Sequence, residues 1–230
     1  MPSDRNSGKE VVIRKATKAD ISFLVKAIVA AEKSGTYTVN YQKIFNLSDR
    51  ELFSFLSKIL KSEEPNHEFT YTSYYVAELQ GRVVAAMSAF IEELDGISSI
   101  AIKSAIIPKM IGIENWKKAV PAFRLLGSLY MDRAPGSLQI EYAHTRPNVQ
   151  AIGLMEKLAR TVMRTEKELH PELKFVEVHA IYENSGTARV CRDIGYVTHL
   201  VVESENDEVL KYVPSKKRIL RRYFYDERVL

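Results

Sequence analysis

The pattern of hydrophobic and polar positions changes period along this chain and divides it into strands and helices. Residues 11–14 have the apolar character of a short strand, and apolar positions then recur at the helical spacing of three and four. Thr17 with Asp20, and Ser48 with Glu51, form capping boxes, which mark helix N-termini. Two amphipathic helices are therefore predicted, one buried along Ile21, Leu24, Val25, Ile28 and Val29, the other, near residues 48–60, along Leu52, Phe55, Leu56 and Ile59.

Two β-rich runs follow, at residues 74–79 and 82–92. The two-residue link Gln80-Gly81 between them is typical of a β-hairpin turn. Residues 94–136 return to helical spacing, and we interpret them as an inserted helical segment with breaks at Gly96, Pro108, Gly112 and Pro121.

Strands and helices alternate in the second half. Strands are predicted at residues 137–145, 174–181, 196–203 and 217–225, and helices at 148–169 and 185–193. The order of elements predicts one α/β domain over residues 1–230, with the helical insertion near 94–136.

Composition limits the class of protein. With 230 residues, 46% of them hydrophobic, the chain can bury one ample core. The single cysteine, Cys191, cannot form an internal disulfide, and the five histidines are too scattered for a metal site. No apolar run approaches the ~20 residues that span a bilayer, and the N-terminus lacks the apolar core of a signal peptide. We therefore expect a cytoplasmic protein without a bound metal.

Positive charge is concentrated at the C-terminal end. Residues 211–230 hold seven Lys and Arg side chains against Asp226 and Glu227, a local charge of +5 beside +4 for the whole chain. Their alternation with Ile219, Leu220 and Tyr223 predicts one solvated face of a terminal strand. Binding to a nucleic-acid backbone is the alternative, and we favour it less because the alternation already accounts for most of these residues.

The candidate chemistry begins where the strand at 138–143 leads through a turn into a long helix. Backbone N–H groups at such a helix N-terminus are unpaired and favour an anion. Gly153 lets the backbone approach phosphate oxygens closely. The turn therefore predicts a phosphate site, the alternative being an ordinary strand–helix turn with a glycine for packing.

Two motifs resemble those of one superfamily, the GNAT acyl-CoA N-acyltransferases. Gln150-x-x-Gly153-x-Met155 resembles their pyrophosphate loop, Gln/Arg-x-x-Gly-x-Gly/Ala, with Met155 in place of the final small residue. Asn184-x-x-Thr187-x-x-Val190-Cys191-x-x-x-Gly195-Tyr196 resembles their later motif, Asn-x-x-Ala-x-x-Leu-Tyr-x-x-x-Gly-Phe. Both lie at predicted strand-to-helix junctions and in the family's order, so each supports the other.

The resemblance implies a fold and a cofactor-binding region. The fold is a mixed, mostly antiparallel, twisted sheet with a split central strand pair and helices on both faces, its CoA-binding core near residues 137–196. Acetyl-CoA is the implied co-substrate, with its pantetheine arm along Ala143 and Thr145. Asn184 either holds that arm or caps the next helix. The pyrophosphate is expected at Gln150, Ala151, Ile152, Gly153, Leu154 and Met155, where the methionine side chain could crowd the anion.

The resemblance also suggests catalytic residues. Glu141, nine residues before Gln150, lies where many of these enzymes place a carboxylate that accepts the amine's proton, although it could equally be an ion-pair partner. His144 is the rival base, and strand alternation predicts that it faces the other side from Glu141. Cys191 replaces the tyrosine that protonates the leaving thiolate, and its alternative role is core packing. Tyr182 and Tyr196 are further candidates for this acid.

The sequence therefore predicts an N-acetyltransferase that moves an acetyl group from acetyl-CoA to a primary amine by direct attack. The alternative is a non-catalytic CoA-binding or regulatory module, which the substitutions at Met155 and Cys191 allow. The acceptor, a small-molecule or a protein amine, is left open, as is the oligomeric state. Trp116 and its apolar neighbours could form a homodimer contact or line an acceptor pocket, but packing within the insertion is the simpler interpretation.

Overall fold

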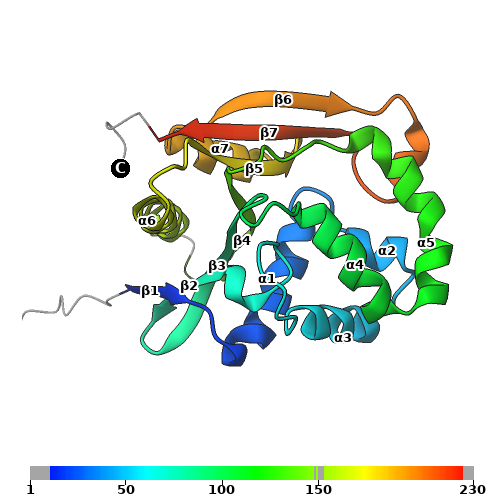
Figure 1. The fold of residues 1–230 in the computed structure, drawn as a ribbon, viewed down its shortest axis with the longest axis horizontal. Coiled ribbons are helices and arrows are strands. Elements are labelled where there is room, and N and C mark those ends of the chain that lie inside the picture. The colour runs from blue at the N-terminus through cyan, green and yellow to red at the C-terminus, as the bar shows by residue number, and fades with distance from the viewer. Residues whose placement is uncertain (1–10, 148, 150–152, 225–230) are drawn as a thin grey trace, which may run out of the picture.

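One seven-stranded sheet organises the protein. The computed structural model describes residues 11–147, 149 and 153–224 (Figure 1). The strands are β1 (Val11–Lys15), β2 (Tyr74–Leu79), β3 (Arg82–Ile91), β4 (Leu138–Thr145), β5 (Phe175–Ile181), β6 (Val197–Glu203) and β7 (Lys216–Tyr223), in the order β1-β2-β3-β4-β5-β7-β6. β4 and β5 are parallel and every other neighbouring pair is antiparallel. The predicted mixed, mostly antiparallel sheet is confirmed.

Helices cover both faces of this sheet. They are α1 (Ile21–Glu32), α2 (Asn40–Ile44), α3 (Asp49–Ile59), α4 (Ser99–Ile111), α5 (Ile113–Leu126), α6 (Leu154–Leu169) and α7 (Ser185–Asp193). Side chains of α1, α3, α4 and α5 share one hydrophobic core with one face, and side chains of α6 and α7 share a second core with the other. Figure 1 shows α6 set apart from the group formed by α1 to α5.

The two helices predicted from capping boxes, α1 and α3, begin near those boxes. Thr17 and Asp20 cap a short 3-10 turn that leads into α1, and Ser48 and Glu51 cap α3. Between them lies α2, which the sequence pattern did not predict. Its five residues are too few to show a helical period, and its packing on the core through Tyr41 and Ile44 comes from tertiary contacts.

The hairpin also forms as predicted. β2 and β3 pair in antiparallel register from Tyr74↔Ser88 to Leu79↔Arg82. Gln80 and Gly81 both have positive φ, 52° and 72°, the conformation that a tight two-residue hairpin turn requires.

The insertion at residues 94–136 contains α4 and α5, as expected, but the predicted breaks differ. Gly112, with φ 87°, does end α4. Pro108 and Pro121 instead lie inside α4 and α5. Each proline removes one helical N–H, and the residues four positions earlier, Ser104 and Lys117, are exposed, so their carbonyl oxygens can bond water instead.

Aromatic packing joins the insertion to the N-terminal helices. The ring of Trp116 lies 5.0 Å from that of Phe123 and 6.4 Å from that of Phe45, measured between centroids. The side chain packs against the first hydrophobic core. Packing, the simpler of the interpretations, is therefore observed for Trp116.

The last strand corrects the interpretation of the basic C-terminal residues. Arg222 is 3% exposed, and Arg221 forms an ion pair of 2.7 Å with the buried Glu177. Arg222 is therefore buried and Arg221 is mostly covered, because β7 lies inside the sheet between β5 and β6, where side chains of the neighbouring strands flank its own. The expectation that this strand carries its positive charge on a solvated face is wrong for them.

No helix among the described residues is long and apolar enough to cross a membrane.

Candidate active site

β4 and β5 separate in the middle of the sheet. They pair only over Leu138–Ile140 with Val176–Val178. Beyond this point β4 stays on β3 as far as Thr145↔Ala85, while β5 stays on β7 as far as Ile181↔Lys217. The split strand pair expected from the resemblance is therefore present. The gap between the two strands lies at their carboxyl ends.

A β-bulge shapes β4 within this split. Glu141 pairs with Ser88 and His144 pairs with Ala86, so two residues of β4 lie opposite one of β3. Tyr142 has φ 48°, a left-handed conformation that is costly for a bulky residue and typical of a bulge at a functional site. The bulge leaves a backbone group of β4 outside the regular ladder.

The bulge also overturns the prediction for His144. Paired residues of neighbouring strands point to the same face, and Ser88 and Ala86 are two residues apart. Glu141 and His144 therefore share a face, where the ring of His144 lies 6.4 Å from that of Phe23 in α1. Alternation fails here because one extra residue stands between them.

α6 is the next α-helix along the chain after β4, and eight residues, 146–153, separate the two. Gly153 caps the helix with φ 60°, is exposed, and no described residue lies within 4 Å of the place where a Cβ would be. The helix begins at Leu154 rather than at Asn148, since the left-handed Gly153 cannot belong to it. Met155 is partly buried and packs against the second hydrophobic core. Of the predicted loop, Gln150, Ala151 and Ile152 lie outside the described residues.

The other predicted cofactor positions lie along β4 and at the start of α7. Ala143 is exposed beside the bulge, and Thr145 is buried. Asn184 caps α7, accepting a hydrogen bond of 3.0 Å from the N–H of Thr187. Its amide nitrogen also donates to the hydroxyl of Ser34 at 3.1 Å. Asn184 thus confirms the capping interpretation and ties the end of β5 to the loop after α1.

Glu141 is held by Arg133. The guanidinium Nη2 donates to Glu141 Oε1 at 2.7 Å, and only 13% of the Glu141 side chain is exposed. Burial raises the pKa of Glu141 above that of an ordinary carboxyl, and the positive charge of Arg133 opposes the rise. A carboxylate with a raised pKa is a better proton acceptor, so these surroundings suit a base.

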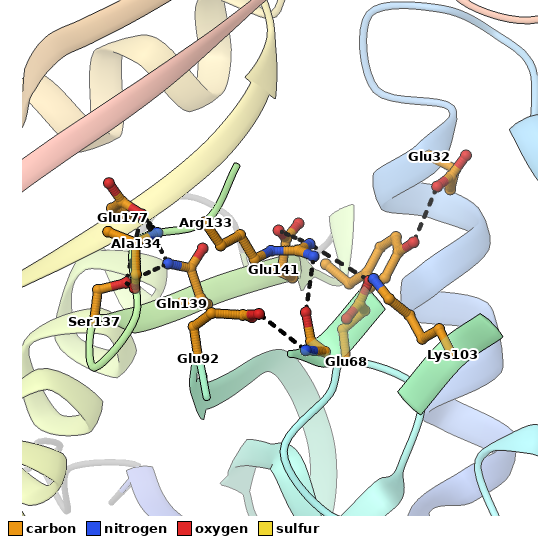
Figure 2. A network of polar contacts seen from close by, with 12 residues as sticks. Glu32, Glu68, Glu92, Lys103, Arg133, Ala134, Ser137, Gln139, Glu141 and Glu177 are labelled. Carbon is orange, nitrogen blue, oxygen red and sulfur yellow. Dashed lines mark hydrogen bonds and ion pairs between the residues drawn. The ribbon is translucent and has the colours of Figure 1, made fainter. Parts of the chain in front are cut away.

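A second buried carboxylate shares the same cation (Figure 2). Glu68 lies 3.5 Å from Arg133 and forms a hydrogen bond with Lys103 of α4. Burial alone would raise the pKa of Glu68, but Lys103 and Arg133 hold it at about 2. The four charges, two of each sign, join four parts of the chain: the segment between α3 and β2, α4, the segment before β4, and β4 itself.

Two further carboxylates fix the neighbouring backbone. Glu177, fully buried, accepts hydrogen bonds from Gln139 at 2.8 Å and from the backbone N–H of Ala134 at 3.3 Å. Glu32 of α1 accepts one from the Tyr142 hydroxyl at 3.2 Å. Figure 2 shows these contacts on either side of Arg133 and Glu141. Both ends of the β4 segment that bears Glu141 are thereby anchored.

Cys191 and Tyr196 lie in the second hydrophobic core. Cys191 is 6% exposed, and burial raises the pKa of its thiol to about 12. Such a thiol is a weaker acid than an ordinary thiol. The Tyr196 hydroxyl donates to the sulfur of Met163. These surroundings favour core packing for both, whereas Tyr182 is 41% exposed at the end of β5.

Sequence reasoning missed the charges around Glu141. Arg133, Glu68, Lys103 and Glu32 lie in four separate segments, and no short motif joins them. A signal existed only at Lys103, a lone charge in the apolar stretch from Ile100 to Ile107. Among the described residues, no group of three His, Cys, Asp or Glu side chains is placed to hold a metal ion.

Several solved structures with a similar fold are acetyltransferases. The chain resembles an N-acetyltransferase from Staphylococcus aureus Mu50 with TM-score 0.63 and 12% identity, over 92% of this chain and 100% of that one. It resembles a Drosophila melanogaster polyamine N-acetyltransferase that forms N-acetylagmatine with TM-score 0.53 and 14% identity, over 94% and 100%. A GNAT-family acetyltransferase from Streptococcus pneumoniae gives TM-score 0.51 and 11% identity, over 93% and 99%. The sequence matches no family model and no curated protein.

Proposed function

We propose that this chain, whose fold is that of the GNAT N-acetyltransferases, moves an acetyl group from acetyl-CoA to a primary amine by direct attack. The observation that carries the proposal is the coincidence of three features at one end of the sheet. They are the split between β4 and β5, the N-terminus of α6, and the buried Glu141.

The split supports binding of an extended arm. Beyond Ile140, the strand edge of β4 that faces β5 has no strand partner, and an edge of this kind can pair with an amide-containing chain. Ala143 is exposed on it. We assign the pantetheine arm of acetyl-CoA to this edge, at Ala143 and Thr145.

The N-terminus of α6 supports binding of the pyrophosphate. The first backbone N–H groups of a helix have no partner within it, and the helix dipole favours an anion there. Gly153 leaves the approach open, and Met155 is turned toward the core. We assign the pyrophosphate to residues 150–155, with Asn184 acting as a helix cap near the arm.

Glu141 supplies the base in this proposal. An ammonium has no lone pair for attack, so its proton must leave before the amine nitrogen bonds to the thioester carbonyl carbon. Glu141 accepts that proton, and the neutral nitrogen bonds to the carbonyl carbon to give a tetrahedral intermediate. As the C–S bond of this intermediate breaks, the leaving sulfur takes a proton from Tyr182 or from water, and the second proton that the nitrogen loses passes through water to restore that donor. A backbone group freed by the bulge can stabilise negative charge on the carbonyl oxygen.

The acceptor we propose is a small-molecule amine. Glu32 and Glu141 present carboxylates from α1 and β4 to the same side of the sheet, which favours a cationic substrate. The similarity to an enzyme that forms N-acetylagmatine agrees with this choice.

Two measurements test the proposal. Isothermal titration with acetyl-CoA should give one site per chain, and a thiol-release screen over monoamines, diamines, polyamines and amino acids should find at least one acceptor. Binding without thiol release from any amine would assign a non-catalytic CoA-binding module instead. Failure to bind acetyl-CoA would remove both.

A further inference from the structure

Arg133 occupies the centre of the buried charge cluster. Its Nη2 donates to Glu141 at 2.7 Å and lies 3.5 Å from Glu68, while its Nη1 donates to the hydroxyl of Ser99 at 3.1 Å. Ser99 begins α4 and is itself held through its backbone N–H by Glu92, at 2.9 Å. The guanidinium is therefore fixed by contacts to three separate segments.

From this geometry, and resting on the function proposed above, we infer that Arg133 is a positioning residue for the base: it binds one oxygen of Glu141 and leaves the other for the proton of the amine. Among the described residues, Oε1 of Glu141 takes the bond from Arg133 and Oε2 takes no hydrogen bond. An arginine can bind both oxygens of a carboxylate at once. Here Nη1 is directed to Ser99 and Nη2 is shared with Glu68, while the buried Nε has no hydrogen-bond partner among the described residues. The contact with Glu141 is therefore single.

Arg133 has no substitute in this cluster. Lys103 bonds to Glu68, not to Glu141. Other titratable side chains lie near Glu141, and those that act on it do so only through their charge. They come from each surrounding element: Glu32 of α1, Tyr41 of α2, Glu68 after α3, Tyr74 of β2, Lys103 of α4, Tyr142 of β4 and Lys217 of β7. In the described part of the chain, Arg133 is the one cation that touches Glu141.

Loss of the guanidinium should therefore protonate the base. Burial already raises the pKa of Glu141, and without Arg133 it would face the negative charge of Glu68 with less compensation. A larger fraction of Glu141 would then be protonated at a given pH, and that fraction cannot accept the proton of the amine. The insertion, through Ser99 and Lys103, would in this way help to set the charge of the base.

The test compares Arg133→Met and Arg133→Lys with Arg124→Met, which removes an exposed arginine from the same insertion. The Glu141 carboxyl is titrated by NMR in protein labelled with δ-carbon-13 glutamate, its signal identified by its loss in Glu141→Gln. We expect Arg133→Met to raise the midpoint by at least one pH unit, Arg133→Lys to raise it less, and Arg124→Met to leave it unchanged. The acid limb of kcat/KM should move with the midpoint.

An unchanged midpoint in Arg133→Met overturns the inference. If that variant does not fold, Arg133→Met combined with Glu68→Gln removes the excess negative charge, and its midpoint is compared with that of Glu68→Gln alone, with the same expected rise. The proposed function is tested by a different result. A wild-type protein that transfers no acetyl group to any amine would refute it, while the NMR titration still decides whether Arg133 holds Glu141.

Discussion

At the scale of single residues, burial decides what each candidate group can do. Cys191 is buried and Glu141 is mostly buried, with 13% of its side chain exposed, but of the two only Glu141 forms an ion pair with a cation. Burial raises the pKa of both. For a carboxylate this strengthens the base, whereas for a thiol it weakens the acid. The same physical cause therefore supports one catalytic assignment and weakens the other.

Replacing Glu141 tests the base. Glu141→Gln keeps the shape of the side chain but accepts no proton, so kcat should fall by about 100-fold or more at pH 7. In the wild type, activity should be lost as pH falls through the raised pKa of Glu141, because only the ionised form is a base. In the variant this loss of activity at low pH should disappear, and the residual rate should rise toward high pH.

Glu114→Gln, an exposed site on α5, is the control. An unchanged pH profile in Glu141→Gln would remove it as the base.

Replacing Cys191 separates acid from packing. Because its thiol is buried with a pKa near 12, we expect Cys191→Ala to keep kcat and acetyl-CoA affinity within about threefold. Removing the sulfur leaves a small cavity, so the free energy of unfolding should fall by about 1 kcal/mol. Steady-state kinetics and urea unfolding give the two readings. A large loss of kcat with normal acetyl-CoA affinity would instead restore the thiol as the acid.

At the scale of elements, departures from regular strand and helix geometry determine where the candidate site lies. A regular β4 would pair along its length and alternate its side chains, but its bulge brings Glu141 and His144 to one face. Likewise α6 starts after a left-handed glycine, Gly153, which sets where the helix N-terminus lies. The positions to which we assign function thus lie where strand and helix depart from their regular geometry.

Gly153 gives a test at this scale. Gly153→Ala puts a methyl group at the mouth of the α6 N-terminus and strains a φ of 60°. We expect the Kd for acetyl-CoA to rise at least tenfold, measured by isothermal titration. Gly81→Ala is a matched control, since its φ is 72° and its Cβ would also meet nothing, but it lies in the hairpin turn. Equal affinities in the two variants would contradict a phosphate site at α6.

At the scale of the whole molecule, buried charges join the insertion to the sheet. Glu68 and Lys103 are both under 9% exposed and bond to each other between α4 and the segment before β2. A buried pair contributes little over an apolar replacement, yet removing Lys103 leaves the buried charge of Glu68 with only the longer, 3.5 Å contact to Arg133. The attachment of the insertion therefore depends on keeping both members.

This dependence is measurable by unfolding. Lys103→Met should lower the free energy of unfolding by about 3 kcal/mol, and the double variant with Glu68→Leu should recover most of the loss. Lys109→Met, at an exposed position of the same helix, should change little. A cost for Lys103→Met as small as that for Lys109→Met would show that the pair does not hold the insertion.

The carboxylate of Glu68 should also make the stability of the fold sensitive to acid. The pKa of Glu68 is about 2 in the folded protein against a reference value of 4.5, so the unfolded chain binds its proton first as pH falls. Its contribution to stability is present above about pH 4.5 and disappears as pH approaches 2. Thermal unfolding should show a steeper loss between pH 5 and 2 in the wild type than in Glu68→Gln. If the unfolding temperatures of the two proteins fell in parallel over this range, Glu68 would not be the cause of the acid sensitivity.

The sequence by itself determined the elements and their order. Capping boxes, hairpin turn and apolar periods are local signals. They placed α3, β2, β3 and α7 within a residue or two, and the first capping box marked the 3-10 turn that precedes α1. Local signals could not reveal α2, the prolines accommodated within α4 and α5, or the bulge, because those depend on which carbonyls face water and which strands pair. Only the tertiary structure brought Arg133, Glu68 and Lys103 to Glu141, since burial and charge pairing act between segments that the chain order keeps apart.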